Sequence, residues 1–215
     1  MKIALLGGTG PEGLGLAARF LAAGETVAIG SRTLERAEGA VGKLRALVPA
    51  GKVTAATNAD AAAASEVIVV SVPFAGLDAT LAACGKALEG KVILDLVVPL
   101  RVDKGVFLLE EVAEGSAAER IQARVPGARV VSGLKHQSAT DLLEVGTALE
   151  GDVLLCGDDD AAKDVVSKLV RDVPRLRPID AGDLRVARHL DAVTALLLNL
   201  NRRHKTRSSI RLVGI

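Results

Sequence analysis

The sequence predicts an α/β protein built on a doubly wound parallel sheet, and three observations lead to this fold class. Short aliphatic runs recur along the chain, as expected of strands that are buried on both faces. Segments with helical periodicity separate these runs and are long enough for right-handed crossovers. A glycine-rich segment, residues 7–15, directly follows the first run and leads into the first helical segment.

The predicted strands and helices alternate along the chain. Ser31 or Thr33 can cap the second helix, and the acidic residues 158–160 suit the positive N-terminal end of the fifth. The last helix is apolar nearly all round at residues 192–200, so we expect it to be buried by the domain itself or by another subunit. Strands are predicted over residues 2–6, 26–29, 52–55, 67–70, 92–94, 128–131 and 153–155, and helices over residues 12–23, 33–48, 75–88, 116–124, 159–171 and 182–203.

The composition excludes several classes of function. The chain has 215 residues, a formal net charge of +1, and 1% aromatic residues with no Trp or Tyr. This length fits one domain, or one domain with a small appendage, around an aliphatic core. Proteins that bind single-stranded nucleic acid stack bases on aromatic rings and are basic, so we expect no nucleic-acid partner. The lack of Tyr also excludes dehydrogenases whose general acid is a tyrosine.

The sulfur and imidazole side chains offer no metal cluster. Cys84 and Cys156 stand alone and the three histidines are scattered, so we expect neither a zinc site nor a disulfide. The longest apolar stretch, residues 67–77, is interrupted and shorter than the roughly 20 residues of a membrane span. The N-terminus lacks signal-peptide features. These observations predict a reduced, cytoplasmic protein with no metal and no membrane role.

The glycine-rich segment contains the pattern G-x-G-x-x-G as Gly8, Gly10 and Gly13. In a turn between a strand and a helix, the first glycine permits the tight turn and the second lets the backbone approach a pyrophosphate. The third allows the helix to pack closely on the strand, and the anion lies at the helix N-terminus. Since the pattern lies between a predicted strand and a predicted helix, we predict a dinucleotide site rather than an ordinary turn.

The end of the second predicted strand indicates which dinucleotide binds. An NAD-binding protein usually has an acidic residue there, whereas this chain has Ser31 and Arg32, with Arg36 one helical turn further on. A hydroxyl and two guanidinium groups suit a 2′-phosphate, so we predict NADP(H) rather than NAD(H). The alternative is that both arginines are simply solvated residues of the first turn.

Two later loops are candidates for the nicotinamide half of the cofactor. The fourth predicted strand leads into Val72, Pro73 and Phe74, and the fifth into Val98 and Pro99. Ligands of doubly wound sheets bind at the carboxyl ends of the strands, where these apolar loops lie. They could hold a nicotinamide ring by packing, or they could be ordinary connections.

The chain resembles the family of coenzyme F420-dependent NADP oxidoreductases, small Rossmann-type proteins that exchange a hydride between NADP(H) and the 5-deazaflavin F420. The resemblance covers essentially the full length. It is carried by KIALLGGTG at residues 2–10, GSR at 30–32, VVS at 130–132, CGDDD at 156–160, RPIDAG at 177–182 and LLLNLN at 196–201.

The resemblance implies roles for particular residues. It implies that Thr9, Gly10, Pro11 and Glu12 cradle the NADP phosphates, that Ser31, Arg32 and Arg36 hold the 2′-phosphate, and that Phe74, Val98 and Ala139 lie along the nicotinamide. The deazaflavin would pack between the segment after Ser132 and the C-terminal tail. We therefore expect residues 1–132 to form an NADP-binding Rossmann domain and residues 133–215 a smaller C-terminal part that covers the crevice and contributes to a homodimer contact.

The chain departs from the family pattern at Lys135 and at Gln137, which leaves alternatives open. Lys135 and His136 stand where the family often has a His pair or His-Thr, and the polar Gln137 stands where an aliphatic residue is expected. A second, more distant resemblance is to the cytosolic domain of six-transmembrane ferric reductases, which pairs NADPH with a flavin. The alternatives are therefore an NADPH-dependent reductase of a flavin or other small acceptor, and a non-catalytic NADP(H)-sensing module.

Hydride transfer between two bound rings needs position and exclusion of water more than acid–base groups. His136 is the candidate for a hydrogen bond to the deazaflavin, and Lys135 for neutralising its charge, although both could be structural. The tail after residue 201 carries five cations and no acid, which suits the acidic side chain of F420 or a solvated helix end.

Overall fold

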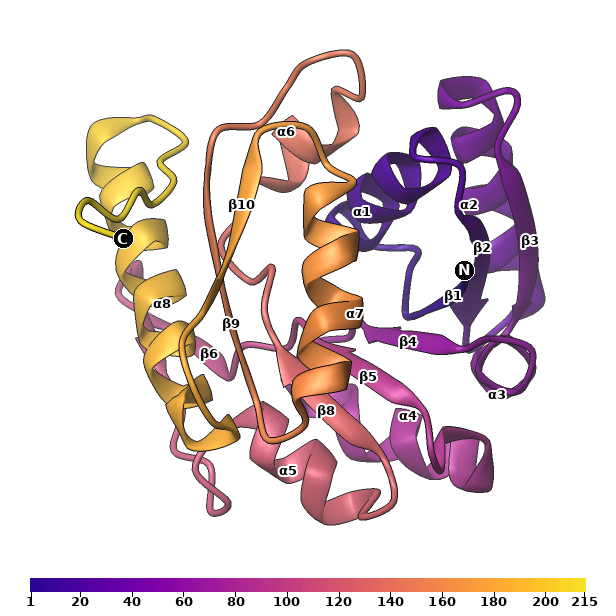
Figure 1. The fold of residues 1–215 in the computed structure, drawn as a ribbon, viewed down its shortest axis with the longest axis horizontal. Helices are drawn as coiled ribbons and strands as arrows, with labels where there is room; N and C mark the ends of the chain where they lie inside the picture. Colours follow the sequence, from indigo (N-terminus) through magenta and orange to yellow (C-terminus); the bar gives the residue numbers. More distant parts are fainter.

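The computed structural model describes residues 1–215 and arranges them around one eight-stranded sheet with helices on both faces (Figure 1). The strand order is β10-β9-β8-β5-β4-β1-β2-β3, so the first strand lies inside the sheet and is flanked by β2 and β4. The predicted doubly wound α/β class is confirmed. The strands are β1 (Lys2–Leu6), β2 (Thr26–Ser31), β3 (Lys52–Thr57), β4 (Val67–Val70), β5 (Val92–Asp95), β8 (Arg129–Ser132), β9 (Gly151–Gly157) and β10 (Leu176–Asp180).

Strand direction changes once across the sheet. In the order of the sheet, the neighbouring strands β3, β2, β1, β4, β5 and β8 pair in parallel. Strand β9 pairs antiparallel with β8, and β10 runs parallel to β9. A parallel neighbour needs a crossover that returns the chain to the opposite edge. After β8 the chain instead stays at the carboxyl edge through residues 133–150 and enters β9 from there. This connection therefore lies where Rossmann-type proteins bind their ligands.

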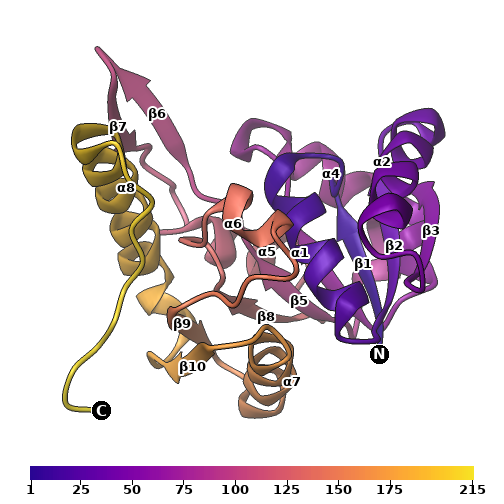
Figure 2. The ribbon, with the colours of Figure 1, turned by 90° about the horizontal axis from the view of Figure 1, so that it is seen from above.

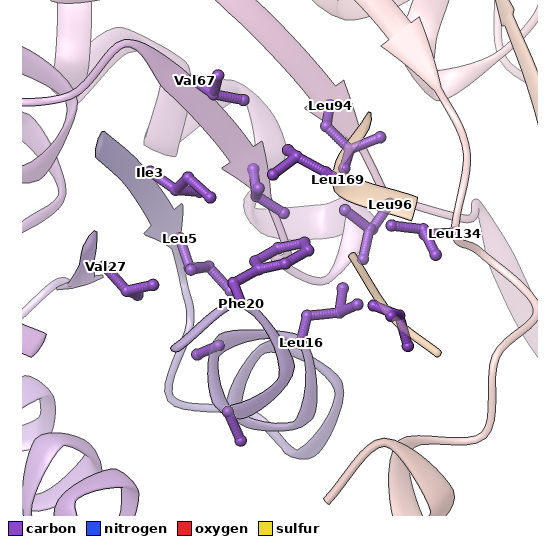
Figure 3. Close-up of a cluster of buried hydrophobic side chains, with 14 of the residues drawn as sticks. Ile3, Leu5, Leu16, Phe20, Val27, Val67, Leu94, Leu96, Leu134 and Leu169 are labelled. Carbon is purple, nitrogen blue, oxygen red and sulfur yellow. The ribbon is translucent and has the colours of Figure 1, made fainter. Parts of the chain in front are cut away.

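Alternation along the strands divides the core into two layers. Ile3 and Leu5 of β1 face α1, α2 and α7, whereas Ala4 and Leu6 face α3, α4, α5 and the start of α8. Figure 3 shows the first layer, with Phe20 of α1 lying against the aliphatic side chains of the strands. The helices are α1 (Pro11–Ala22), α2 (Leu34–Leu47), α3 (Asn58–Ala63), α4 (Leu77–Cys84), α5 (Ala117–Arg124), α6 (Ala139–Leu143), α7 (Asp160–Arg171) and α8 (Ala187–His204).

A two-stranded hairpin of β6 (Leu100–Asp103) and β7 (Val106–Leu109) projects from the sheet beside α8 (Figure 2). Asn199 of α8 fixes it: its Oδ1 accepts a hydrogen bond from the Phe107 N–H at 2.9 Å, and its Nδ2 donates to the Phe107 carbonyl at 2.8 Å. Hairpin and helix therefore form one unit at the end of the molecule remote from β3.

The observed elements extend the predicted ones. The predicted strands and helices are all present, and the helix predicted over 75–88 is divided at Gly85, where φ is +50°. The elements missed by sequence patterns are α3, α6, the β6–β7 hairpin and β10. Pro178 lies inside β10 and argues against a strand, but β10 is an edge strand, where a missing N–H is tolerated.

The final helix is buried on one side only. Leu190 and Ala195 are buried against the domain, whereas Leu196 is 57% exposed and Leu200 is 37% exposed. Of the two expected alternatives, burial all round by the domain itself is therefore not observed, and burial by another subunit stays a prediction. The division at residue 132 stays a prediction, and β9 and β10 extend the same sheet beyond it.

Candidate active site

The turn between β1 and α1 has the geometry that a bound pyrophosphate requires. A Cβ on Gly8 would lie 2.7 Å from the Leu5 Cβ, and one on Gly13 would lie 2.8 Å from the Gly8 Cα, so both positions are closely packed. A Cβ on Gly10 would meet nothing within 4 Å. The turn is thus tight at its first and third glycines and open above its second, and it fits a dinucleotide.

The end of β2 lies beside this turn because β2 pairs with β1. Arg32 and Arg36 are exposed, and neither guanidinium takes part in the ion pairs of the chain. Asn58, the first residue of α3, accepts a hydrogen bond from the Gly7 N–H at 3.2 Å and packs where a Cβ on Gly30 would lie. The buried Asn58 amide therefore joins the glycine turn to the ends of β2 and β3.

A cavity of about 520 Å³ opens beside the glycine turn, which is within the usual range for small-molecule sites. Its walls come from the start of α1, the carboxyl ends of β4 and β5, the segment after β8, the inner side of α8 and the C-terminal tail. The lining residues outside the predicted set are Ser71, Leu96, Val97, Leu100, Gln137, Ser138, Thr194, Leu197, Leu198, Asn201, Arg207 and Ser208.

The structure brings most of the predicted site residues to this cavity. Those that line it are Gly10, Pro11, Glu12, Gly13, Val72, Pro73, Val98, Lys135, His136 and Ala139. Those that do not line it are Gly8, Thr9, Ser31, Arg32, Arg36, Phe74 and Pro99.

Two predicted nicotinamide contacts lie outside the cavity wall. The Phe74 ring lies 5.3 Å from the Arg120 guanidinium carbon in a cation–π contact. Pro99 is buried, and its carbonyl accepts a hydrogen bond from the Glu110 N–H at 2.8 Å, which closes the base of the β6–β7 hairpin. No Phe side chain lines the cavity, so its apolar wall is aliphatic.

The backbone turns sharply directly after β8, and this turn sets the direction of the Lys135 and His136 side chains. Leu134 is fully buried at φ +56°, a left-handed conformation that costs an L-residue roughly 1–2 kcal/mol. The Lys135 ammonium lies 2.7 Å from the Asp95 carboxylate and 2.6 Å from that of Asp191, and it donates to the Val97 carbonyl at 2.8 Å. These partners occupy its three N–H donors, and a role for Lys135 in neutralising the charge of a coenzyme stays a prediction.

The Lys135 group is a buried ion cluster that joins β5, β8 and α8. Burial raises the pKa of Asp191 to about 6, although Lys135 acts in the opposite direction. Asp95 also accepts a hydrogen bond from the Val97 N–H at 2.9 Å. The cluster therefore joins the end of β5 and the segment after β8 to α8.

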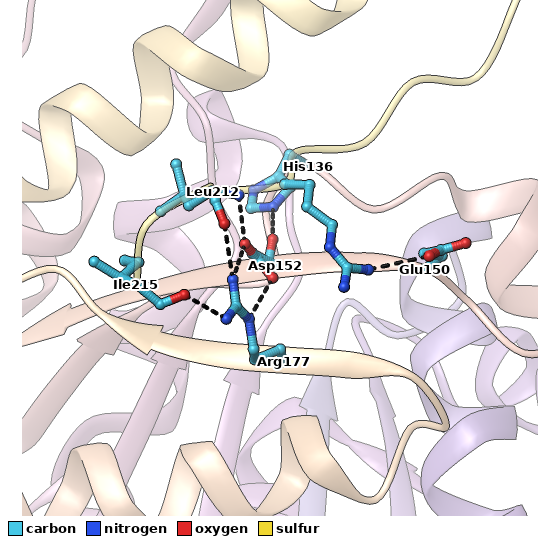
Figure 4. Close-up of polar contacts among 7 residues, drawn as sticks. His136, Glu150, Asp152, Arg177, Leu212 and Ile215 are labelled. Carbon is cyan, nitrogen blue, oxygen red and sulfur yellow. Dashed lines mark hydrogen bonds and ion pairs between the residues drawn. The ribbon is translucent and has the colours of Figure 1, made fainter.

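His136 is buried with its Nε2 2.8 Å from the Asp152 carbonyl (Figure 4). A carbonyl only accepts hydrogen bonds, so Nε2 carries the proton and Nδ1 is the acceptor. Burial lowers the pKa of His136, against the raising effect of this hydrogen bond. The imidazole is therefore neutral at pH 7, and as a cavity-lining group it offers an acceptor.

The C-terminal tail is attached to the sheet at the same place. The Asp152 carboxylate accepts two hydrogen bonds from Arg177, both at 2.8 Å, and one from the Leu212 N–H at 2.6 Å (Figure 4). Arg177 and Leu212 together hold the pKa of Asp152 at about 2. Further up the tail, Arg207 forms an ion pair with Asp141 of α6 at 3.0 Å. These contacts make the tail one wall of the cavity.

The opposite wall depends on a buried arginine of α1. Arg19 donates its five N–H bonds, at 2.6 to 3.3 Å, to carbonyls that end α6 and the loop after it. These carbonyls belong to Asp141, Leu142, Glu144, Val145 and Thr147. A helix leaves its last carbonyls unsatisfied, and Arg19 satisfies those of α6 in place of water. Arg19 therefore holds α6, and with it residues 135–139, against the dinucleotide turn.

The structure contains neither a helix that could span a membrane nor a side-chain cluster that could hold a metal ion. None of the helices combines the length and apolar character of a membrane span. No three His, Cys, Asp or Glu side chains are arranged to hold a metal ion. Cys84 and Cys156 are both free thiols and buried.

The parallel sheet, the glycine turn and the cavity at the carboxyl ends of β4 and β5 define a dinucleotide-binding protein of the Rossmann class. A family model described as "NADP oxidoreductase coenzyme F420-dependent" matches residues 2–99. The chain is 40% identical to the F420-dependent NADP reductase of Methanothermobacter thermautotrophicus, over 100% of this chain and 96% of that protein. It is 35% identical to the F420-dependent NADP reductase of Methanocaldococcus jannaschii, over 100% of this chain and 99% of that protein.

The fold comparison agrees with the sequence comparison. The crystal structure of a candidate F420-dependent NADP-reductase from Arthrobacter sp. FB24 superposes on this chain with a TM-score of 0.86 at 30% identity, over 99% of both chains. The chain belongs to the family of F420-dependent NADP reductases, as its sequence resemblance predicts.

Sequence patterns did not predict the contacts of three side chains near the site, which are those of Arg19, Asp191 and Asp152. Arg19 interrupts the apolar face of α1, which is a signal that a buried charge has partners. Asp191 and Asp152 carried no local signal, because their partners lie 56 and 25 residues away in the chain.

Proposed function

We propose that this protein transfers a hydride between NADP(H) and the deazaflavin coenzyme F420. The observation that carries the proposal is the continuity of the site. The open backbone at Gly10 leads into one cavity that extends past the ends of β4 and β5 to α8. Such a cavity offers a second ring a place beside the nicotinamide, which a module that only senses NADP(H) does not need.

The dinucleotide would lie along the ends of β1 and β2. The N–H groups at the start of α1 bind the pyrophosphate, and the free guanidinium groups of Arg32 and Arg36 bind the 2′-phosphate. Val72 and Pro73 on one side, and Val98 and Ala139 on the other, enclose the nicotinamide ring. Phe74 and Pro99 would support these loops from behind, because neither lines the cavity.

The second ring would lie against the aliphatic side chains of α8 and the hairpin, Leu197, Leu198 and Leu100. The two coenzymes supply the redox chemistry. The chain holds the rings in contact, excludes water and offers the neutral His136 imidazole as a hydrogen-bond acceptor. Lys135 contributes by fixing the segment that carries His136.

A flavin is the second candidate acceptor, and one observation favours it. Gln137 lines the cavity with a polar amide where the family pattern leads us to expect an aliphatic residue. A changed polar edge is how a site of this kind would accept a different ring.

One experiment separates these functions. Purified protein is mixed with NADPH and, separately, with F420, FMN or FAD, and the visible absorbance of each acceptor is followed with that of NADPH. Loss of F420 absorbance matched by NADPH consumption, with no turnover of FMN or FAD, is the expected result. Turnover with a flavin alone overturns the proposal in favour of the second candidate, and binding of NADPH without turnover leaves only the sensing function.

The assembly we propose is a homodimer in the cytoplasm. Leu196 and Leu200 of α8 are 57% and 37% exposed, and Val102 and Val106 of the adjoining hairpin are 62% and 47% exposed. Several large exposed apolar side chains on one unit suit a subunit contact. The same helix lines the cavity with Leu197 and Leu198, so the contact would support the second-ring wall.

A further inference from the structure

Two polar atoms at the cavity have no hydrogen-bond partner. The four buried side-chain N and O atoms of the chain without a partner belong to Glu12, Glu114, Gln137 and Asp191. Glu114 lies within ion-pair distance of Arg120, and Asp191 belongs to the Lys135 cluster. Glu12 and Gln137 have no such cation, and both line the cavity. Buried polar groups are nearly always satisfied, so these two point to a ligand that the cavity takes.

The two groups come from different walls and have complementary chemistry. Glu12 is the second residue of α1, and its Oε1 is the unpartnered atom. Gln137 lies in the segment after β8, and its Nε2, a donor, is the unpartnered atom. Both residues line the same cavity, so an unpartnered acceptor belongs to one of its walls and an unpartnered donor to another.

The protonation state of Glu12 adds a second donor. Burial raises the pKa of Glu12 to about 8, against the lowering effect of the Lys135 ammonium. The other basic groups that line the cavity are His136, which is neutral, and Arg207, which is paired with Asp141. At pH 7 the carboxyl is therefore mainly a neutral acid with one O–H donor and one C=O acceptor. A neutral acid is also compatible with a pyrophosphate at the same helix N-terminus, where a carboxylate would be repelled.

We propose that the Glu12 and Gln137 side chains bind the planar amide edge of a ring ligand, pairing its carbonyl with a donor and its N–H with an acceptor. This inference deepens the proposed function and rests on it. Two ligands of that function have such an edge: the carboxamide of the nicotinamide and the pyrimidinedione of the deazaflavin. An aliphatic residue at either position would leave that edge unsatisfied.

The test measures binding of one ligand at a time, without turnover. Dissociation constants for NADPH, for its 3-acetylpyridine analogue and for F420 are measured with the wild type, Glu12→Gln, Glu12→Leu and Gln137→Leu. The analogue has a methyl group in place of the amide NH₂. Glu38→Gln, at an exposed glutamate of α2, is the matched control. Thermal unfolding of each variant checks that it is folded.

A nicotinamide edge predicts that the wild type binds the analogue roughly tenfold more weakly than NADPH, and that Glu12→Leu binds both equally weakly. A deazaflavin edge predicts that Glu12→Leu and Gln137→Leu weaken F420 roughly tenfold and leave the ratio of NADPH to analogue unchanged. If both variants bind all three ligands within about twofold of the wild type, the inference is overturned.

Glu12→Gln supplies the second readout. The amide keeps a donor and an acceptor but does not titrate, so its affinity is expected to match that of the wild type at pH 6.5. Wild-type affinity for the ligand that uses the edge should fall as the pH rises through about 8, because Glu12 ionises, whereas that of Glu12→Gln should stay level. A level wild-type profile would contradict the neutral-acid assignment. Since no hydride transfer is involved, these constants stand whether or not the protein turns over F420.

Discussion

Replacing Lys135 by Met removes the only cation from a buried cluster that contains two carboxylates. The ammonium lies 2.7 Å from Asp95 and 2.6 Å from Asp191, and none of the three side chains is more than 1% exposed. Met has a similar length and fills the same space, so the substitution changes charge far more than volume. We expect Lys135→Met to fold but to lose much of its stability at alkaline pH.

The magnitude follows from the loss of one partner in a buried ion pair, which costs about 3–5 kcal/mol. Its pH dependence follows from Asp191, whose pKa in the folded protein is already about 6, above its ordinary value of 3.8. An acid with a raised folded-state pKa binds its proton more tightly when folded, so its contribution to stability declines as the pH rises through that window. Without Lys135 the pKa rises further. The variant should therefore approach the wild type at pH 5 and lose about 3–5 kcal/mol at pH 8.

Urea unfolding of the variant and of the wild type at pH 5 and pH 8 measures the difference in their free energy of unfolding at each pH. The matched control is Lys135→Met combined with Asp191→Asn, which removes one carboxylate and should recover part of the loss at pH 8. A loss below about 1 kcal/mol at pH 8, or an equal loss at both pH values, would refute the account of the cluster as a buried ion group.

Three other expected outcomes test separate parts of the structure. Arg32→Asp should weaken NADPH binding tenfold to more than a hundredfold, by loss of about 1.5–3 kcal/mol, and leave NADH binding nearly unchanged; an unchanged preference in fluorescence titrations would contradict the 2′-phosphate site. Arg19→Met should lower the free energy of unfolding by about 3 kcal/mol, because the carbonyls that end α6 lose their donor, and equal denaturant midpoints would rule this out. Leu196→Glu should give monomers in analytical ultracentrifugation, whereas an intact dimer would place the subunit contact elsewhere.

Most of the fold could be predicted because the central strands contain short aliphatic runs and the turns between them are local. The run KIALL followed by Gly7 predicts the strand, the turn and the helix that follows, and the structure places all three as expected. The predicted dinucleotide residues gather for the same reason: parallel pairing of β1 with β2 and β4 brings their carboxyl ends to one edge.

The remaining parts depend on contacts between distant residues. The sequence around Lys135 does not indicate that its ammonium pairs with Asp95 and Asp191, because these carboxylates lie 40 residues before it and 56 residues after it. The antiparallel direction of β9 follows from the course of residues 133–150, which have no pattern of their own beyond the one-turn α6. Phe74 was expected at the nicotinamide because it follows β4, but its ring lies on Arg120, to which it is held by a cation–π contact.

The strand order has a consequence for how the protein is made. The first five strands form a continuous block, β3-β2-β1-β4-β5, and β8, β9 and β10 then add one after another at a single edge. During synthesis the glycine turn can therefore be assembled while the rest of the chain is still emerging. The segment after β8, α8 and the tail arrive last and complete the cavity, so a nascent or truncated chain would acquire its dinucleotide turn well before it could enclose a second ring.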